Sequence, residues 1–319
     1  MAENPEPEAP KLTYDSYLQV TALLGIQKPI SPVHDEHLFI IVHQAFELWF
    51  KQVLHDVDSV RKLFYGKTWD GIPLHTVVNR LQRVVLVLRL IVEHFHVLET
   101  MPPLNFVDFR DYLIGGSGFQ SLQFRKIEKL LGIKDDKRAK YEGKDYKDKI
   151  DKKDKSTILE YPEDPDGITL LDVVESWLTG TPGIDDELFW KQYSRYQKTD
   201  LEWLLDEEKY AKVKDSWQMS RQSLQGALFI KLHQDKAEFQ LPYQFLTLLM
   251  DIDVALMKWR STHIHMVHRM IGRKHGTAST GGNSGYEYLR TTYNDNYKVF
   301  GDLFNLATYL RPREEIEKC

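Results

Sequence analysis

Apolar residues recur every three or four positions along most of this chain, the spacing that gathers them on one face of a helix. Polar and charged residues fill the positions between them. The pattern predicts helices over these ranges: 34–64, 76–95, 105–115, 119–132, 170–193 with a break at Gly-Thr-Pro-Gly, 241–272 and 292–309. Because glycine commonly closes a helix, we expect the helix over 119–132 to end at Gly132.

The alternation of apolar and polar residues that marks a strand is scarce, and no hairpin turn lies between alternating runs. We therefore predict an all-α fold. We expect a disordered tail over 1–11 and a single helical domain over 12–319, with a helical insertion at about 134–215. Within this insertion, 134–155 alternates Lys with Asp, which favours a solvated helix or a loop.

Composition narrows the class of protein. The 319 residues carry a formal net charge of −5, which argues against a nucleic-acid-binding face. The longest apolar runs are too short or too charged to span a membrane. The single cysteine, Cys319, allows no disulfide within the chain, and the acidic, proline-rich N-terminus has no signal-peptide pattern. We expect a soluble, cytoplasmic protein.

Three histidines crowd into the stretch KWRSTHIHMVHRM, residues 258–270. On a helix that turns about 100° per residue, only His263 falls on the apolar stripe, while His265 and His268 point away from it. A zinc pair would need histidines four residues apart on one face, but Val267 stands four residues after His263. His263 is therefore either an ordinary core histidine or the single imidazole that a haem iron binds.

A second isolated histidine lies in the stretch EHLFIIVHQAFELWFKQVL, residues 36–54. His43 is surrounded on its helix face by Phe39, Phe46 and other apolar residues. It too is either a core histidine or a member of a functional site. Its spacing from the preceding histidines is wrong for a compact helical metal triad.

Two further stretches contain candidate binding residues. Phe106 and Arg110 lie one turn apart, so they share a helix face. This arginine is either a surface residue or, inside a cleft, a planar fork that fits a carboxylate. The glycine-rich stretch 273–292 lacks the Lys-Ser/Thr ending of a phosphate-binding loop, which leaves a mobile connector or a segment that approaches a ligand closely.

In order along the chain, these blocks resemble the tryptophan 2,3-dioxygenase family. The resemblance is carried by TYDSYLQV, PVHDEHLFIIVHQAFELWFKQVLHD, LETMPPLNFVDFRDYLIGGSGFQSLQFRKIEKLLG, LTLLMDIDVALMKWRSTHIHMVHRMIG, GGNSGYEYLRTT and YKVFGDLFNLATYLRPRE. They fall within about 12–133 and 222–315, while 134–215 has no recognisable motif. The resemblance implies the helical haem-dioxygenase fold and the O₂-dependent opening of the indole ring of L-tryptophan to N-formyl-L-kynurenine.

The resemblance also implies which residues hold the cofactor, which is haem b in its ferrous form. His263 matches the iron ligand, Trp259 an aromatic residue on the same side of the haem, and Arg125 a partner of a haem propionate. Ser117 and Gly118 match small residues near the bound O₂ and the substrate.

On the substrate side, the resemblance implies that His43 is the catalytic histidine that hydrogen-bonds the indole N–H. Arg110 would bind the substrate carboxylate, with Phe106 beside it and Phe39 forming a wall. Whether His43 removes the indole proton or only accepts a hydrogen bond from it is left open by the sequence.

The resemblance further implies a homotetramer with one haem per subunit. Tyr14 and Tyr17 would reach into the pocket of a neighbouring subunit. A loop threonine would bind the substrate ammonium. This loop is three residues longer here than in relatives, so either Thr277 or Thr280 takes the role, and we favour Thr280 from the double glycine that follows it.

Three alternatives remain open at this stage. A related haem hydroxylase or monooxygenase would act on tyrosine or a modified tryptophan. A haem-binding sensor would need no arginine for a substrate carboxylate. A helical scaffold would bind no cofactor at all.

Overall fold

A computed structural model describes residues 12–113, 121–135, 138, 161–162, 167–196, 201–272 and 285–318. Every regular element among these residues is a helix, which confirms the all-α prediction for the part of the chain described. The expected tail over 1–11 and most of 134–160 lie outside the described residues.

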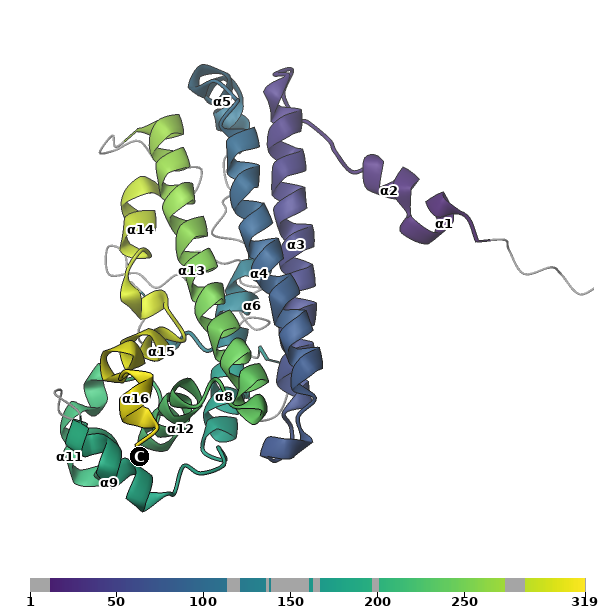
Figure 1. Cartoon of the computed structure of the whole chain (residues 1–319). Coiled ribbons are helices and arrows are strands. Elements are labelled where there is room, and N and C mark those ends of the chain that lie inside the picture. Colours follow the sequence, from purple (N-terminus) through teal and green to yellow (C-terminus); the bar gives the residue numbers. More distant parts are fainter. Residues whose placement is uncertain are drawn as a thin grey trace, which may run out of the picture.

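Three long helices form the body of the molecule: α3 (Asp35–Leu63), α4 (Leu74–Leu98) and α13 (Ala237–Ile271). They lie side by side, and α4 packs against both of the others (Figure 1). The α5 (Pro103–Arg110) and η2 (Asp111–Leu113) helices follow α4 at one end of the bundle. α6 (Leu122–Leu131) packs along α3.

The remaining helices are shorter, and most gather at the opposite end of the bundle (Figure 1). The helices at that end are α8 (Leu170–Leu178), α9 (Glu187–Tyr196), α10 (Glu202–Leu205), α11 (Glu207–Val213), η6 (Lys214–Ser216), α12 (Arg221–Leu232), α15 (Gly301–Asn305), η8 (Leu306–Tyr309) and α16 (Arg313–Ile316). The other short helices are α1 (Tyr14–Leu18), α2 (Val20–Leu24), η1 (Trp69–Gly71), α14 (Gly285–Thr291) and η7 (Asp295–Tyr297).

Local sequence signals set several helix ends. α3 has Asp35 and Glu36 in its first turn and Arg61 and Lys62 in its last, which complements the helix dipole. α6 begins at its N-cap Ser121 and ends at Gly132, as predicted. The φ angle of Gly132 is 123°, and a Cβ there would lie 2.7 Å from the Leu171 Cβ, so only glycine suits this close approach of α6 and α8.

Two predicted helices need comment. The helix predicted over 105–115 is α5 as far as Arg110 and the 3-10 helix η2 over Asp111–Leu113, and 114–115 lie outside the described residues. The single helix expected over 292–309 is wrong, because this region forms η7, α15 and η8. Within it, the buried carboxylate of Asp253 on α13 accepts hydrogen bonds from the backbone N–H groups of Val299 (2.9 Å) and Phe300 (2.7 Å), which holds a non-helical link where the spacing predicted a helix turn.

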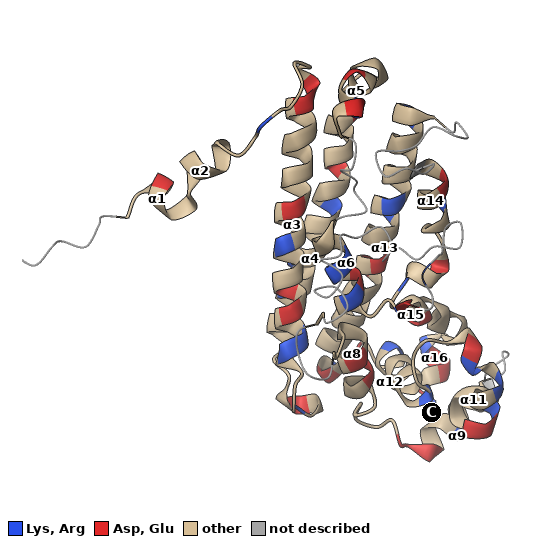
Figure 2. Cartoon of the chain, turned by 180° about the vertical axis from the view of Figure 1, so that it is seen from behind, with Lys and Arg blue, Asp and Glu red and all other residues tan. Residues whose placement is uncertain are grey.

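Acidic and basic residues are interspersed over the described helices (Figure 2). The helical segment α1–α2 projects away from the bundle (Figure 1), and Tyr14 and Tyr17 are 77% and 70% exposed. None of the helices in the described ranges is both long enough and apolar enough to cross a membrane.

Candidate active site

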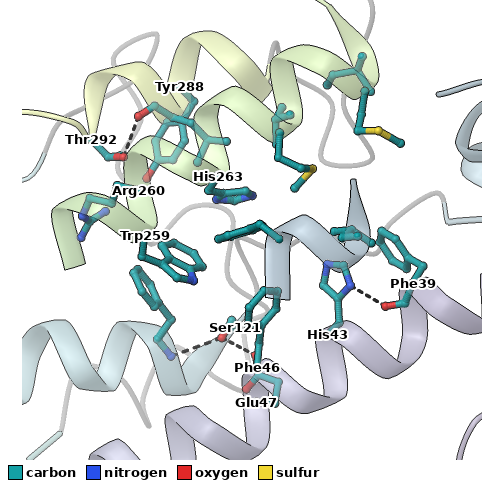
Figure 3. A pocket seen from close by; sticks show the side chains of 18 of the residues that line it. Phe39, His43, Phe46, Glu47, Ser121, Trp259, Arg260, His263, Tyr288 and Thr292 are labelled. Atoms are coloured by element: carbon teal, nitrogen blue, oxygen red, sulfur yellow. Dashed lines mark hydrogen bonds between the residues drawn. The ribbon is translucent and has the colours of Figure 1, made fainter. Parts of the chain in front are cut away.

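A pocket of about 260 Å³ opens in the half of the bundle that holds the start of α3 and the end of α13. α3, α4, α5, α6, α13 and α14 all contribute lining side chains. Most of these side chains are aromatic or aliphatic. Figure 3 shows His43 on α3 and His263 on α13 facing this pocket from opposite sides.

His43 is held in one tautomer by its own helix. Its Nδ1 lies 2.7 Å from the carbonyl oxygen of Phe39, one turn earlier. A carbonyl oxygen can only accept, so Nδ1 carries the proton and donates it, and Nε2 keeps its lone pair. Burial lowers the pKa of His43, although the Phe39 carbonyl and the charge of Glu47 oppose that effect. The imidazole is thus neutral at pH 7 and has an acceptor nitrogen available.

His263 has a more apolar setting. Its ring stacks on Phe95 with centroids 5.5 Å apart and lies 5.0 Å from the Trp259 ring. Its buried Nδ1 has no hydrogen-bond partner. Burial, with smaller contributions from the charges of His43 and Arg260, lowers the pKa of His263 to about 3. His263 is therefore a neutral imidazole at the pocket wall.

α5 brings Arg110 and Phe106 to the same pocket. The Phe39 ring on α3 lies 5.9 Å from Phe106 and 5.6 Å from Phe109, so aromatic contacts fix α5 against α3. Arg110 is half-buried. A guanidinium on the wall of a largely apolar cavity suits a ligand carboxylate.

A buried ion cluster closes another wall of the pocket. Glu128 accepts hydrogen bonds from Arg125 (3.1 Å), from Arg138 and from Arg260 on α13. Although burial opposes ionisation, the charges of the three arginines hold the pKa of Glu128 well below its usual range. Arg125 and Arg260 also line the pocket, which gives this wall two cationic groups.

The structure brings seven of the predicted site residues to one pocket: Phe39, His43, Phe106, Arg110, Arg125, Trp259 and His263. His265 and His268 are exposed and do not line this pocket, as the helical pattern predicted, and His268 stacks on Tyr286 at 4.3 Å. The described residues contain no group of three or more His, Cys, Asp or Glu side chains that could hold a metal ion.

The other predicted residues are not among the described residues that line this pocket. Tyr14 and Tyr17 lie on the projecting α1, away from the bundle. Ser117, Gly118, Thr277 and Thr280 lie outside the described residues. The roles implied for these residues stay predictions.

Sequence reasoning missed several pocket residues: Glu47, Ser121, Arg260, Tyr288 and Thr292. Arg260 directly follows Trp259, and its partner Glu128 lies 132 residues away in sequence. Glu47 lies four residues after His43, so the helical spacing could have placed it beside that histidine. No local signal was available for Tyr288 and Thr292, which enter through the packing of α14 on α13.

An all-α chain that closes one apolar pocket between two neutral imidazoles and an arginine defines a binding or catalytic site for a small, partly anionic aromatic molecule. Comparison with known proteins identifies the class more closely. The model of the tryptophan 2,3-dioxygenase family matches residues 2–216 and 196–310. The chain is 43% identical to mouse tryptophan 2,3-dioxygenase and 41% identical to zebrafish tryptophan 2,3-dioxygenase B, in both cases over 96% of this chain and 84% of the relative.

The chain therefore belongs to the tryptophan 2,3-dioxygenase family, whose members are oxidoreductases. The resemblance seen in the separate sequence blocks is confirmed over most of the chain, including the middle region that has no recognisable motif.

The family depends on haem, and the pocket can be tested against that cofactor. Three buried nitrogens on α13 have no hydrogen-bond partner, and all belong to pocket-lining residues: Nε1 of Trp259, Nε of Arg260 and Nδ1 of His263. A neutral imidazole between apolar walls is the setting that haem iron requires, and the cationic wall suits the propionate groups. The residues present fit a haem.

Proposed function

We propose that this pocket binds haem b and L-tryptophan, and that the protein cleaves the indole C2–C3 bond with O₂ to give N-formyl-L-kynurenine. The observation that carries the proposal is the single cavity in which His43 keeps a free acceptor nitrogen, Arg110 offers a carboxylate fork, and His263 lies opposite. Membership of the tryptophan 2,3-dioxygenase family supports the same reaction.

His263 is the residue that would bind the iron, because its imidazole is neutral and makes no hydrogen bond through Nδ1. Trp259 and Phe95 would pack beside it. Arg125 would hold a propionate, and the geometry adds Arg260, whose guanidinium is fixed by Glu128 and lies over the Tyr297 ring at 4.4 Å. When bound, ferrous haem supplies the activation of O₂, and both oxygen atoms enter the product, so no external reductant is consumed.

The chain itself would position the amino acid. Arg110 would clamp the carboxylate through charge-assisted hydrogen bonds, and Phe39 and Phe106 would flank the indole. Because the Phe39 carbonyl fixes the proton on Nδ1, His43 would accept the indole N–H through Nε2. Aromatic and aliphatic walls around these groups would exclude water and strengthen both polar contacts.

Other assignments extend this proposal. Ser117 and Gly118 would lie near O₂ and the substrate, and Thr280 or Thr277 would bind the substrate ammonium. We propose one catalytic domain over 12–319, one ferrous haem per subunit and a cytoplasmic location.

We also propose a homotetramer in which the N-terminal segments are exchanged. The projecting α1 supports this arrangement, because Leu12, Tyr14 and Tyr17 are each at least 70% exposed. Apolar side chains that extend from the bundle in this way need a partner surface. Tyr14 and Tyr17 would then reach the pocket of a neighbouring subunit.

An anaerobic titration of the reduced protein with L-tryptophan, followed by admission of air, tests the function. We expect N-formyl-L-kynurenine, with both added atoms derived from ¹⁸O₂ by mass spectrometry. A product with one added oxygen would indicate the related hydroxylase or monooxygenase. A ferrous protein that binds L-tryptophan and yields no oxygenated product would contradict the proposal.

A further inference from the structure

Glu47 is an acidic side chain in a pocket wall that otherwise carries positive charge. It lies one helical turn after His43 on α3 and lines the same cavity. Among the described residues that line this pocket, it is the only acid, whereas Arg110, Arg125 and Arg260 are cationic. The proposed roles of the other lining residues do not use this carboxylate.

Glu47 joins two helices of the site. Its carboxylate accepts hydrogen bonds from Ser121 Oγ (2.6 Å) and Gln123 Nε2 (2.9 Å), and its backbone carbonyl also accepts from Gln123 Nε2 (2.7 Å). Ser121 is in turn the N-cap of α6 and accepts the backbone N–H of Phe124 (3.3 Å). Figure 3 shows Ser121 and Glu47 together at the edge of the pocket. The start of α6 is thus fixed on the helix that carries His43.

The charge of the same carboxylate also acts electrostatically on the His43 imidazole. Burial lowers the pKa of His43, and the charge of Glu47 works against that decrease. The other charged or titratable groups that face this region are Arg110 on α5, Arg125 on α6, Arg260 and His263 on α13, the phenol of Tyr288 on α14, and His94 on α4, whose ring lies 5.7 Å from Phe46. The arginines and histidines are cationic when charged, so they oppose protonation of His43, and Glu47 favours it.

We propose that Glu47 is a positioning residue of the active site, which fixes the start of α6 against α3 and supplies the negative charge beside His43. This inference rests on the proposed function. The carboxylate need not touch the substrate: it acts through Ser121 and Gln123 on α6, and through its charge on the imidazole.

Mutations separate the effect of the Glu47 charge on His43 from the effect of the hydrogen bonds to α6. Glu47→Gln removes the charge and keeps the shape, and Glu47→Asp keeps the charge but withdraws it by one methylene. Ser121→Ala and Gln123→Met keep the charge and remove hydrogen bonds that link Glu47 to α6. Glu93→Gln, an exposed position on α4, is the matched control for the loss of one negative charge. Each holoenzyme is assayed for kcat and KM with L-tryptophan from about pH 5 to about pH 9, and its thermal midpoint is measured.

We expect the acid limb of kcat/KM to move to lower pH in the order wild type, Glu47→Asp, Glu47→Gln. The full shift should be roughly one pH unit, a tenfold change in proton affinity, because loss of a negative charge makes His43 harder to protonate. Ser121→Ala and Gln123→Met should raise KM and lower the thermal midpoint, while the acid limb of kcat/KM stays at the wild-type pH. Glu93→Gln should match the wild type.

An acid limb that stays in place in both Glu47 variants overturns the proposal, as does a limb that moves equally in Ser121→Ala. If Glu47→Gln does not accumulate as folded holoenzyme, Glu47→Asp alone must show the smaller shift. These results differ from a failure of the proposed function, in which the wild-type enzyme itself would form no N-formyl-L-kynurenine at any pH.

Discussion

Two histidines in this protein have almost the same local geometry and very different surroundings. His43 stacks on Phe39 with ring centroids 4.0 Å apart at 35°, and His233 stacks on Phe229 at 4.0 Å and 33°. Each Nδ1 donates to the carbonyl oxygen of that phenylalanine, at 2.7 Å and 2.9 Å. In both pairs the histidine follows the phenylalanine by four residues, within α3 for His43 and at the C-cap of α12 for His233, so local geometry sets the ring contact and the tautomer.

The two histidines differ in what lies on the side of the ring away from the phenylalanine. His43 looks into the pocket beside Glu47, opposite His263. His233 lies against Phe189 (5.1 Å) and Phe239 (5.8 Å) in an aromatic cluster and does not line the pocket. Local sequence can therefore produce a neutral imidazole with a fixed proton, and only tertiary packing decides whether the second nitrogen meets a ligand.

The largest expected effect concerns a third imidazole, that of His263. We expect His263→Ala to abolish haem binding, because among the described residues no other imidazole lies at that wall of the pocket. The measurement is the Soret absorbance per protein after purification and haem addition. His233→Ala should retain the wild-type haem content, and a wild-type Soret spectrum from His263→Ala would contradict the assignment.

A smaller effect is expected at Arg110. Arg110→Ala should lower kcat/KM for L-tryptophan by about 30- to 1,000-fold, since the loss of one partner from a buried charge pair costs about 2–4 kcal/mol. Indole-3-propionate, which has the carboxylate but no amine, isolates this interaction from that of the loop threonine. Unchanged KM values for both compounds would exclude the carboxylate clamp.

Substitution of the two matched histidines should separate catalysis from stability. His43→Ala should lower kcat/KM roughly 3- to 10-fold through loss of one hydrogen bond, with little change in the free energy of unfolding. His233→Ala should leave kcat/KM of the folded holoenzyme unchanged and lower that free energy by roughly 2–4 kcal/mol, because it opens a cavity among aromatic rings. Denaturant unfolding and steady-state kinetics on both variants give the test, and equal kinetic losses would remove the distinction.

The smallest effect is a pH dependence of stability. Burial lowers the pKa of His233 in the folded state below the value of about 6.5 that it has when unfolded. As pH falls below about 6.5, the unfolded chain binds a proton that the native state does not, so the free energy of unfolding falls by up to about 1.4 kcal/mol per pH unit.

His233→Phe removes this titration and fits the aromatic cluster. Its free energy of unfolding should therefore decline less steeply than that of the wild type between about pH 6.5 and the lower folded pKa. Chemical denaturation at several pH values measures both slopes. Parallel slopes would mean that His233 is protonated equally easily in the two states.

Helical periodicity predicted most of the long helices and identified His263 as the histidine of its helix that faces the pocket. The spacing of apolar residues placed α3, α4, α6 and α13 close to their observed bounds, and it selected His263 over His265 and His268. These predictions hold because a long amphipathic helix fixes the direction of every side chain on it. The same reasoning failed over 292–309, where the side chain of Asp253 competes for backbone N–H groups.

The sequence pattern could not predict contacts between segments that are far apart in the chain. Glu128 and Arg260 meet across 132 residues, and Ser121 meets Glu47 across 74. Neither pair carries a periodic signal, because a polar residue on a helix face looks the same whether it meets solvent or a buried partner. Family resemblance supplied Arg110 and Arg125, but the ion cluster behind Arg125 required the packed structure.

The way α13 is anchored has a consequence for how this chain can vary in length. Asp253 ties the middle of α13 to the backbone of Val299 and Phe300, and His263 lies further along the same uninterrupted helix. One residue inserted or deleted between them would swing the imidazole about 100° around the helix axis and out of the pocket. The number of residues between Asp253 and His263 is therefore fixed by the geometry of α13. Insertions or deletions that preserve activity must fall in the connecting segments outside this span.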